Sequence, residues 1–162
     1  MAPFRFGLFL VALFLFQLVF LSRIPWLAQA MDPLLLVLIF LGFRIRSARF
    51  LWAYGVALGL LKDLAIGNLF GISGAAFGLV GWLIASTRHL VEREDPILQG
   101  IWAGLLSMIQ GLTAVLLLMA MEPAMRSIPG WGILPVSMLI NGGIAAWGFP
   151  RLERWLDLRC DS

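Results

Sequence analysis

The chain has 162 residues, of which 61% are apolar and only 13% carry a charge. This composition lies far outside the range of soluble domains, so we expect a single integral membrane domain over 1–162. The net charge of +3 comes from scattered arginines and one lysine, which excludes the clustered basic surface that nucleic-acid binding needs. One histidine and one cysteine are too few for a metal centre, and we expect neither a metal nor a cofactor.

Six apolar stretches separated by short polar gaps are predicted to be transmembrane helices. They cover 6–22, 33–43, 50–66, 70–87, 97–121 and 133–149. A helix needs about 20 residues to cross the ~30 Å hydrocarbon core, so the stretch 33–43 is short. Either it borrows residues before Pro33, or it lies at a thin or protein-buried position. Residues 151–159 place Leu152 and Trp155 on one face, which predicts a short amphipathic helix at the membrane surface.

The basic residues are divided unevenly between the gaps. Nine lie before the first stretch, in alternate gaps and in the tail: Arg5, Arg44, Arg46, Arg49, Arg88, Arg93, Arg151, Arg154 and Arg159. The opposite side has only Arg23 and Arg126 in its gaps and Lys62 near the adjacent end of the third stretch. Because cytoplasmic loops carry the excess of Lys and Arg, we expect both termini on the cytoplasmic side of the membrane.

A stripe of small residues marks the third and fourth predicted helices. Its members recur mostly at every fourth position: Gly55, Gly59, Asp63 and Gly67, followed by Gly71, Gly74 and Gly78. On a helix this spacing forms one face. Small side chains let helix backbones approach closely in a membrane. The stripe therefore predicts either a groove for a partner helix or tight packing of these two helices against each other.

Asp63 is the polar residue with the sharpest prediction. An unpaired carboxylate within lipid costs about 2–3 kcal/mol, so Asp63 is expected to face protein. The free N–H groups at the start of the fourth helix can receive it as a structural clasp, and a ligand or proton site is the alternative. The adjacent Lys62 is expected to reach outward to the membrane surface. Asn141 in the last helix is expected to hydrogen-bond between helices.

The segment from Gly59 to Gly71, Gly-Leu-Leu-Lys-Asp-Leu-Ala-Ile-Gly-Asn-Leu-Phe-Gly, resembles the rod-shape-determining MreD family of bacteria. It is similar to the family's order of a glycine, an aspartate four residues later and two further glycines at four-residue intervals. The Asn141-Gly142 pair, the six predicted helices and the basic tail are also similar. The resemblance implies an all-α bundle of six transmembrane helices in the bacterial cytoplasmic membrane. Its fold would be like that of the substrate-binding subunits of energy-coupling-factor transporters.

The resemblance also implies a non-enzymatic scaffold or regulator of the cell-wall elongation machinery. The sequence offers no catalytic pair or triad that can be placed on one side of the membrane, so an enzyme is not expected. The implied partner is the transmembrane region of MreC, with MreB, RodA and a class B penicillin-binding protein in the same complex. The fold similarity leaves a second interpretation open, the substrate-binding membrane subunit of a vitamin-type transporter.

Overall fold

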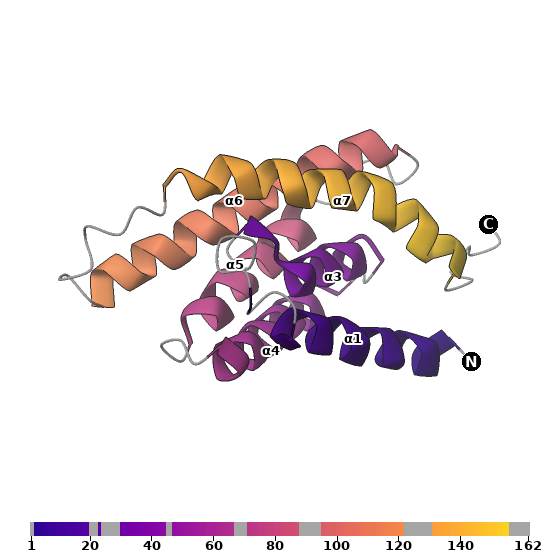
Figure 1. The fold of residues 1–162 in the computed structure, drawn as a ribbon, viewed down its shortest axis with the longest axis horizontal. Coiled ribbons are helices and arrows are strands. Elements are labelled where there is room, and N and C mark those ends of the chain that lie inside the picture. Colours follow the sequence, from indigo (N-terminus) through magenta and orange to yellow (C-terminus); the bar gives the residue numbers. More distant parts are fainter. Residues whose placement is uncertain are drawn as a thin grey trace.

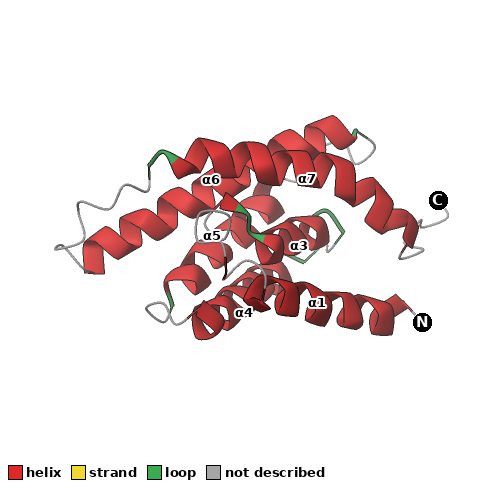
Figure 2. Cartoon of the chain, in the orientation of Figure 1, coloured by secondary structure: helices red, strands yellow, loops and turns green. Residues whose placement is uncertain are grey.

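The computed structural model describes residues 2–19, 23, 30–44, 47–66, 71–87, 95–121 and 131–155. In this part of the chain all regular structure is helical (Figure 1, Figure 2). The helices are α1 (Ala2–Val19), α3 (Pro33–Gly42), α4 (Ala48–Ile66), α5 (Ile72–Thr87), α6 (Pro96–Met121) and α7 (Ile133–Trp155). Their bounds agree with the six apolar stretches to within a few residues, apart from the end of α7.

The last helix is longer than the sequence predicts. α7 runs without a break through Pro150 to Trp155, so the described part of 151–159 is no separate helix, and 156–159 lie outside the described residues. Pro150 has no backbone N–H to donate to the carbonyl oxygen of Ala146, so the helix lacks one bond there. In the next turn the side chains of Arg151 and Arg154 donate to the carbonyl oxygens of Trp147 (2.8 Å) and Pro150 (3.2 Å). These contacts support the last turns of the helix.

α3 forms the centre of the molecule (Figure 1). Its ten residues are apolar on every side, and such a helix is stable when it is buried all round. Leu35, Leu38 and Ile39 are completely buried. Ten residues give a helix of only about 15 Å, half the ~30 Å hydrocarbon core. The structure therefore explains the short stretch 33–43 by its position, since the helix is buried within the protein.

α3 runs alongside α7 in the same direction. Asp32, at the start of α3, contacts Asn141, and Arg44, just after its end, pairs with Glu153. Both pairs are 109 positions apart in the sequence, so the two helices advance together. The start of α3 therefore lies beside the middle of α7, deep in the bundle. Its end lies beside the C-terminal part of α7.

Two antiparallel helix pairs, α4–α5 and α6–α7, pack around α3 (Figure 1). The core between them is filled by aliphatic and aromatic side chains from α3 and its neighbours. Phe40 of α3 packs edge-on against Phe149 of α7, with ring centroids 5.4 Å apart. This central core holds α3 in place, and with it the polar groups at the start of α3 in the interior of the molecule.

The outer faces of the other helices are apolar. Leu64, Ile97 and Leu139 are 68%, 70% and 75% exposed. By length and composition, α6 and α7 are each long and apolar enough to cross a membrane. Exposed apolar surface on this scale is uncommon on soluble monomers and favours a membrane-associated protein.

Candidate functional site

The glycine stripe lies in the contact between α4 and α5. A Cβ atom at Gly55 or at Gly59 would collide with the backbone carbonyl group of Phe77 or of Ser73, respectively. A Cβ at Gly78 would lie only 2.8 Å from a methyl carbon of Val56. Glycine permits this approach because it has no side chain. At these positions the small residues serve packing within the chain.

Gly71 and Gly74 lie at the start of α5. Gly71 has a φ of 105°, a conformation that residues with side chains rarely adopt, and it leads the chain into the helix. A Cβ at Gly74 would meet the flexible side chain of Leu60 at 3.1 Å, so Gly74 tolerates added bulk better than Gly59 does. Gly67, the remaining member of the predicted stripe, lies outside the described residues.

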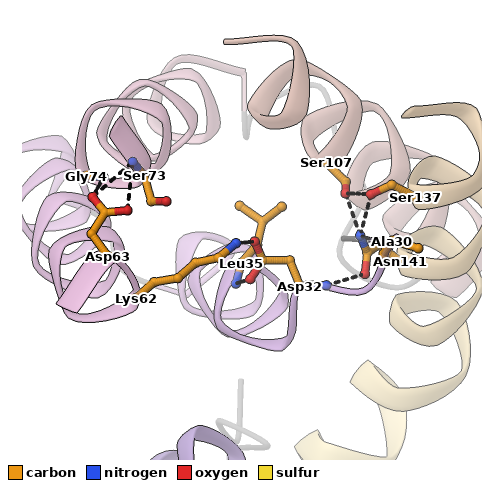
Figure 3. Close-up of polar contacts among 10 residues, drawn as sticks. All are labelled: Ala30, Asp32, Leu35, Lys62, Asp63, Ser73, Gly74, Ser107, Ser137 and Asn141. Carbon is orange, nitrogen blue, oxygen red and sulfur yellow. Dashed lines mark hydrogen bonds and ion pairs between the residues drawn. The ribbon is translucent and has the colours of Figure 1, made fainter. Parts of the chain in front are cut away.

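Asp63 caps the N-terminus of α5 (Figure 3). Its buried carboxylate accepts hydrogen bonds from the amide nitrogens of Gly71 (2.9 Å), Ser73 (3.1 Å) and Gly74 (3.4 Å). N–H groups in the first turn have no partner within a helix, and the positive end of the helix dipole favours a negative charge. This is the geometry expected of a structural clasp. It joins the end of α4 to the start of α5.

Lys62 does not reach outward, so that prediction is wrong. Its ammonium group pairs with the carboxylate of Asp32, and the two side chains are only 12% and 7% exposed (Figure 3). The ammonium nitrogen also lies 5.3 Å from the ring centroid of Phe77, within the range of a cation–π contact. A lysine extends to the membrane surface when no counter-charge is closer. Here the start of α3 supplies one.

Asp32 connects three helices. Its Oδ1 accepts the amide N–H of Leu35 at 3.5 Å, which is an N-cap contact at the start of α3. Its Oδ2 pairs with Lys62 of α4. Its own backbone N–H donates to Oδ1 of Asn141 in α7, at 3.2 Å. Asp followed by Pro is a helix-start signal in the sequence, but nothing local marks Asp32 as the partner of Lys62 and Asn141.

Asn141 is completely buried at the centre of a neutral hydrogen-bonded group (Figure 3). Its side-chain nitrogen lies 2.6 Å from the hydroxyl of Ser107, 3.1 Å from that of Ser137 and 3.3 Å from the carbonyl oxygen of Ala30. The two hydroxyls are 3.0 Å apart. An amide nitrogen has two hydrogens, so these acceptors share them. The group joins α6, α7 and the segment before α3.

Together these contacts form what we call the buried polar cluster (Figure 3). It comprises Asp32, Lys62, Asp63, Ser107, Ser137 and Asn141. Each of these side chains is bonded to another group of the protein, so the cluster holds helices together and leaves few groups to receive a substrate. Within the described residues, no group of three or more His, Cys, Asp or Glu side chains is placed to hold a metal ion.

Comparisons with protein-family models, with curated proteins and with solved structures found no match for this chain. Membership of the MreD family therefore stays a prediction that rests on the motif from Gly59 to Gly71. Of that motif, Gly59, Asp63 and Gly71 lie among the described residues, and all three lie at the α4–α5 contact.

Proposed function

We propose that this chain is a non-enzymatic membrane scaffold that regulates the bacterial cell-wall elongation machinery and helps to maintain rod shape. The observation that carries the proposal is the α4–α5 pair. Gly59 allows its backbones to touch, while Asp63 and Gly71 form the cap that closes it. The motif residues that the structure describes serve helix packing, which is compatible with a protein that acts through shape and assembly rather than through catalysis.

The proposed location is the bacterial cytoplasmic membrane, with six spans and both termini in the cytoplasm. Three observations support it: the exposed apolar faces, the length of α6 and α7, and the uneven distribution of arginines. The buried polar cluster adds a fourth. Charged groups inside membrane proteins face the bundle interior and pair with one another, as Lys62 and Asp32 do.

The proposed partner is the transmembrane region of MreC, with MreB, RodA and a class B penicillin-binding protein in the same assembly. Gly55, Gly59 and Gly78 are already covered by neighbouring helices, so the partner is not expected there. An outer face of α7 offers better access. Leu139 is 75% exposed, and a Cβ at Gly143, one turn later, would meet no atom within 4 Å. A small residue on an open face lets another helix approach closely.

Co-purification tests this proposal. The affinity-tagged chain is co-expressed with full-length MreC and purified in a mild detergent, and MreC is quantified in the eluate. We expect retention of MreC, and loss of an MreC whose span is replaced by an unrelated apolar helix. Gly143→Leu should lower retention, whereas Gly148→Leu, on the same helix and also without a neighbouring atom within 4 Å, should not. Equal retention of the span-replaced MreC would contradict the proposed contact.

The transporter-subunit interpretation receives less support from the structure. A substrate pocket for a vitamin-sized molecule needs polar groups that converge on it. The described polar groups at the start of α3 are instead bonded to one another. The same purification distinguishes the two interpretations, because recovery of ATPase subunits or of a bound vitamin-sized ligand would replace the scaffold proposal.

A further inference from the structure

An apolar groove lies between α1, α3 and α7. Its volume is about 420 Å³, which lies within the ~300–1,000 Å³ range of small-molecule sites. α1 contributes Phe9 and Leu13, α3 contributes Phe40, and α7 contributes Gly148 and Leu152. No member of the buried polar cluster lines the groove, although Met31 and Pro33, on either side of Asp32, do.

Arg151 is the only charged residue among those described that line the groove. Its guanidinium donates to the carbonyl oxygen of Trp147 at 2.8 Å and stacks on the indole of the same residue, 3.8 Å from the ring centroid. These contacts hold the positive charge at the edge of the groove. A guanidinium has five N–H donors, and the bond to Trp147 occupies only one of them. The side chain is therefore placed to bind an anionic group.

The length of the groove matches one leaflet of a membrane. Its lining on α7 extends from Ile144 to Trp155, a distance of about 16 Å along the helix. That is close to half of the ~30 Å hydrocarbon core. Trp155 lies at one end, against Phe9 of α1, with ring centroids 6.2 Å apart. In the proposed orientation this end is cytoplasmic, where anionic headgroups attract arginines.

We infer that this groove binds an acyl chain of an anionic phospholipid, with the lipid phosphate at Arg151. The alternative of a partner helix fits the lining less well. A helix is about 10–12 Å wide and associates through small residues, whereas this lining is mostly aromatic or branched, with Gly148 as its one glycine among the described residues. A flexible chain adapts to such a surface, and Arg binds phosphate through paired N–H groups. The inference rests on the proposed membrane location but not on the scaffold role.

The inference is tested with the purified full-length chain, delipidated in detergent. Dioleoyl phosphatidylglycerol, dioleoyl phosphatidylcholine or inorganic phosphate is added, and the thermal unfolding midpoint is measured. A ligand that binds only the folded state raises the midpoint. We expect phosphatidylglycerol to raise it more than phosphatidylcholine does, and inorganic phosphate to leave it unchanged. Arg151→Gln should weaken the apparent affinity for phosphatidylglycerol about tenfold, through loss of a charge-assisted contact.

Gly148→Leu tests the groove itself. Its Cβ would meet no atom within 4 Å, so the added side chain can enter the groove without displacing the backbone. We expect the variant to fold and to lose the response to phosphatidylglycerol. Two matched controls should keep the wild-type response. Gly143→Leu adds the same bulk to an open face of α7, and Arg154→Gln removes an exposed arginine that does not line the groove.

The possible outcomes separate this inference from the proposed location. Equal lipid responses in all variants would overturn the groove as the lipid site. An equal rise of the unfolding midpoint with inorganic phosphate would indicate an anion site that binds no acyl chain, which also overturns the inference. Extraction of native membranes with alkaline carbonate is measured in parallel. A chain that is released into the soluble fraction contradicts the proposed membrane location. A chain that stays in the membrane while its variants respond alike contradicts the groove alone.

Discussion

The two antiparallel helix pairs are closed by different chemistry. Both rely on close backbone contact, since a Cβ at Gly59 would strike the Ser73 carbonyl and one at Gly104 would lie 2.8 Å from the carbonyl oxygen of Met138. α4–α5 adds a charged carboxylate at a helix end, whereas α6–α7 adds a neutral amide and hydroxyls at mid-helix. A helix N-terminus has free N–H groups and a favourable dipole, and the middle of a helix has neither. Charge is thus placed where the backbone can stabilise it.

One residue, Asp32, connects the polar contacts of the two pairs. Lys62 of α4 reaches the carboxylate of Asp32, and Asn141 of α7 accepts from its backbone N–H. The start of α3 is therefore the point at which both pairs are fixed to the central helix. The contact on the α4 side is ionic and the contact on the α7 side is neutral. Removing the ionic contact and removing the neutral contact should therefore lower the free energy of unfolding by different amounts.

Lys62→Met is expected to have the largest effect. It leaves the Asp32 carboxylate buried without its counter-charge, and such a change lowers the free energy of unfolding by about 3–5 kcal/mol. The double variant Lys62→Met with Asp32→Asn should recover most of the loss, because the buried charge is then gone. Both are measured by denaturant unfolding in detergent micelles. If Lys62→Met alone is as stable as the wild type, the pair contributes nothing to stability.

Gly59→Ala is expected to cause the next-largest loss of stability. A methyl group there meets backbone atoms that cannot rotate away, and overpacking of this kind costs about 1–3 kcal/mol. Gly104→Ala should cost less, because its nearest backbone atom is farther away. Gly143→Ala is the matched control on an open face, and it should leave stability unchanged or raise it by up to about 1 kcal/mol. Thermal unfolding of the three variants in one detergent ranks them.

Asp63→Ala tests the charged cap. It leaves the N–H groups of Gly71, Ser73 and Gly74 without their acceptor, which costs about 1–3 kcal/mol. Asp63→Asn keeps an acceptor but loses the charge, so a smaller loss of stability is expected. Hydrogen exchange at the first turn of α5 should rise in both variants, more in the first. Unchanged exchange there would mean that the cap does not hold the helix start.

The helices and the N–H donors that bond to Asp63 can be predicted from the sequence, because both depend on local information. Apolar runs and polar gaps mark helix bounds, and Asp63 is close in sequence to the N–H groups that it caps. The direction of the Lys62 side chain cannot be predicted in this way, for the opposite reason. Its partner is 30 positions away, and only the packing of α3 brings the two together. The same holds for the link between Asp32 and Asn141, 109 positions apart.

The C-terminal part of α7 shows a second limit of local signals. Pro150 indicates a helix end, and the amphipathic pattern after it indicates a separate surface helix. The structure continues the helix, with arginine side chains bonded to carbonyl oxygens of the preceding turn. The groove could not be predicted for a related reason. It exists only because α1, α3 and α7 meet, and no motif in any one of them marks it.

Asn141→Leu probes the neutral side of the link. The amide is bonded to Ser107, Ser137 and Ala30, and hydrogen bonds between membrane helices contribute about 0.6–1.7 kcal/mol. We therefore expect a smaller loss than for Lys62→Met, measured under the same conditions. Ser137→Ala should cost less again, because Asn141 keeps its other acceptors. A loss for Asn141→Leu as large as that for Lys62→Met would remove the distinction between the ionic and the neutral link.

Glu153→Gln should have the smallest effect. Glu153 pairs with Arg44 at the far end of α3, where the side chains are 37% and 23% exposed, and ion pairs with solvent access contribute about 0–1 kcal/mol. Arg44 has other contacts that hold it in place. It donates to the backbone carbonyl oxygen of Phe40 at 3.1 Å, and its guanidinium lies 3.7 Å from the centroid of the Phe40 ring. Denaturant unfolding with and without added salt measures the contribution. A cost near that of Lys62→Met would mean that α3 is fixed equally at both ends, rather than mainly at Asp32.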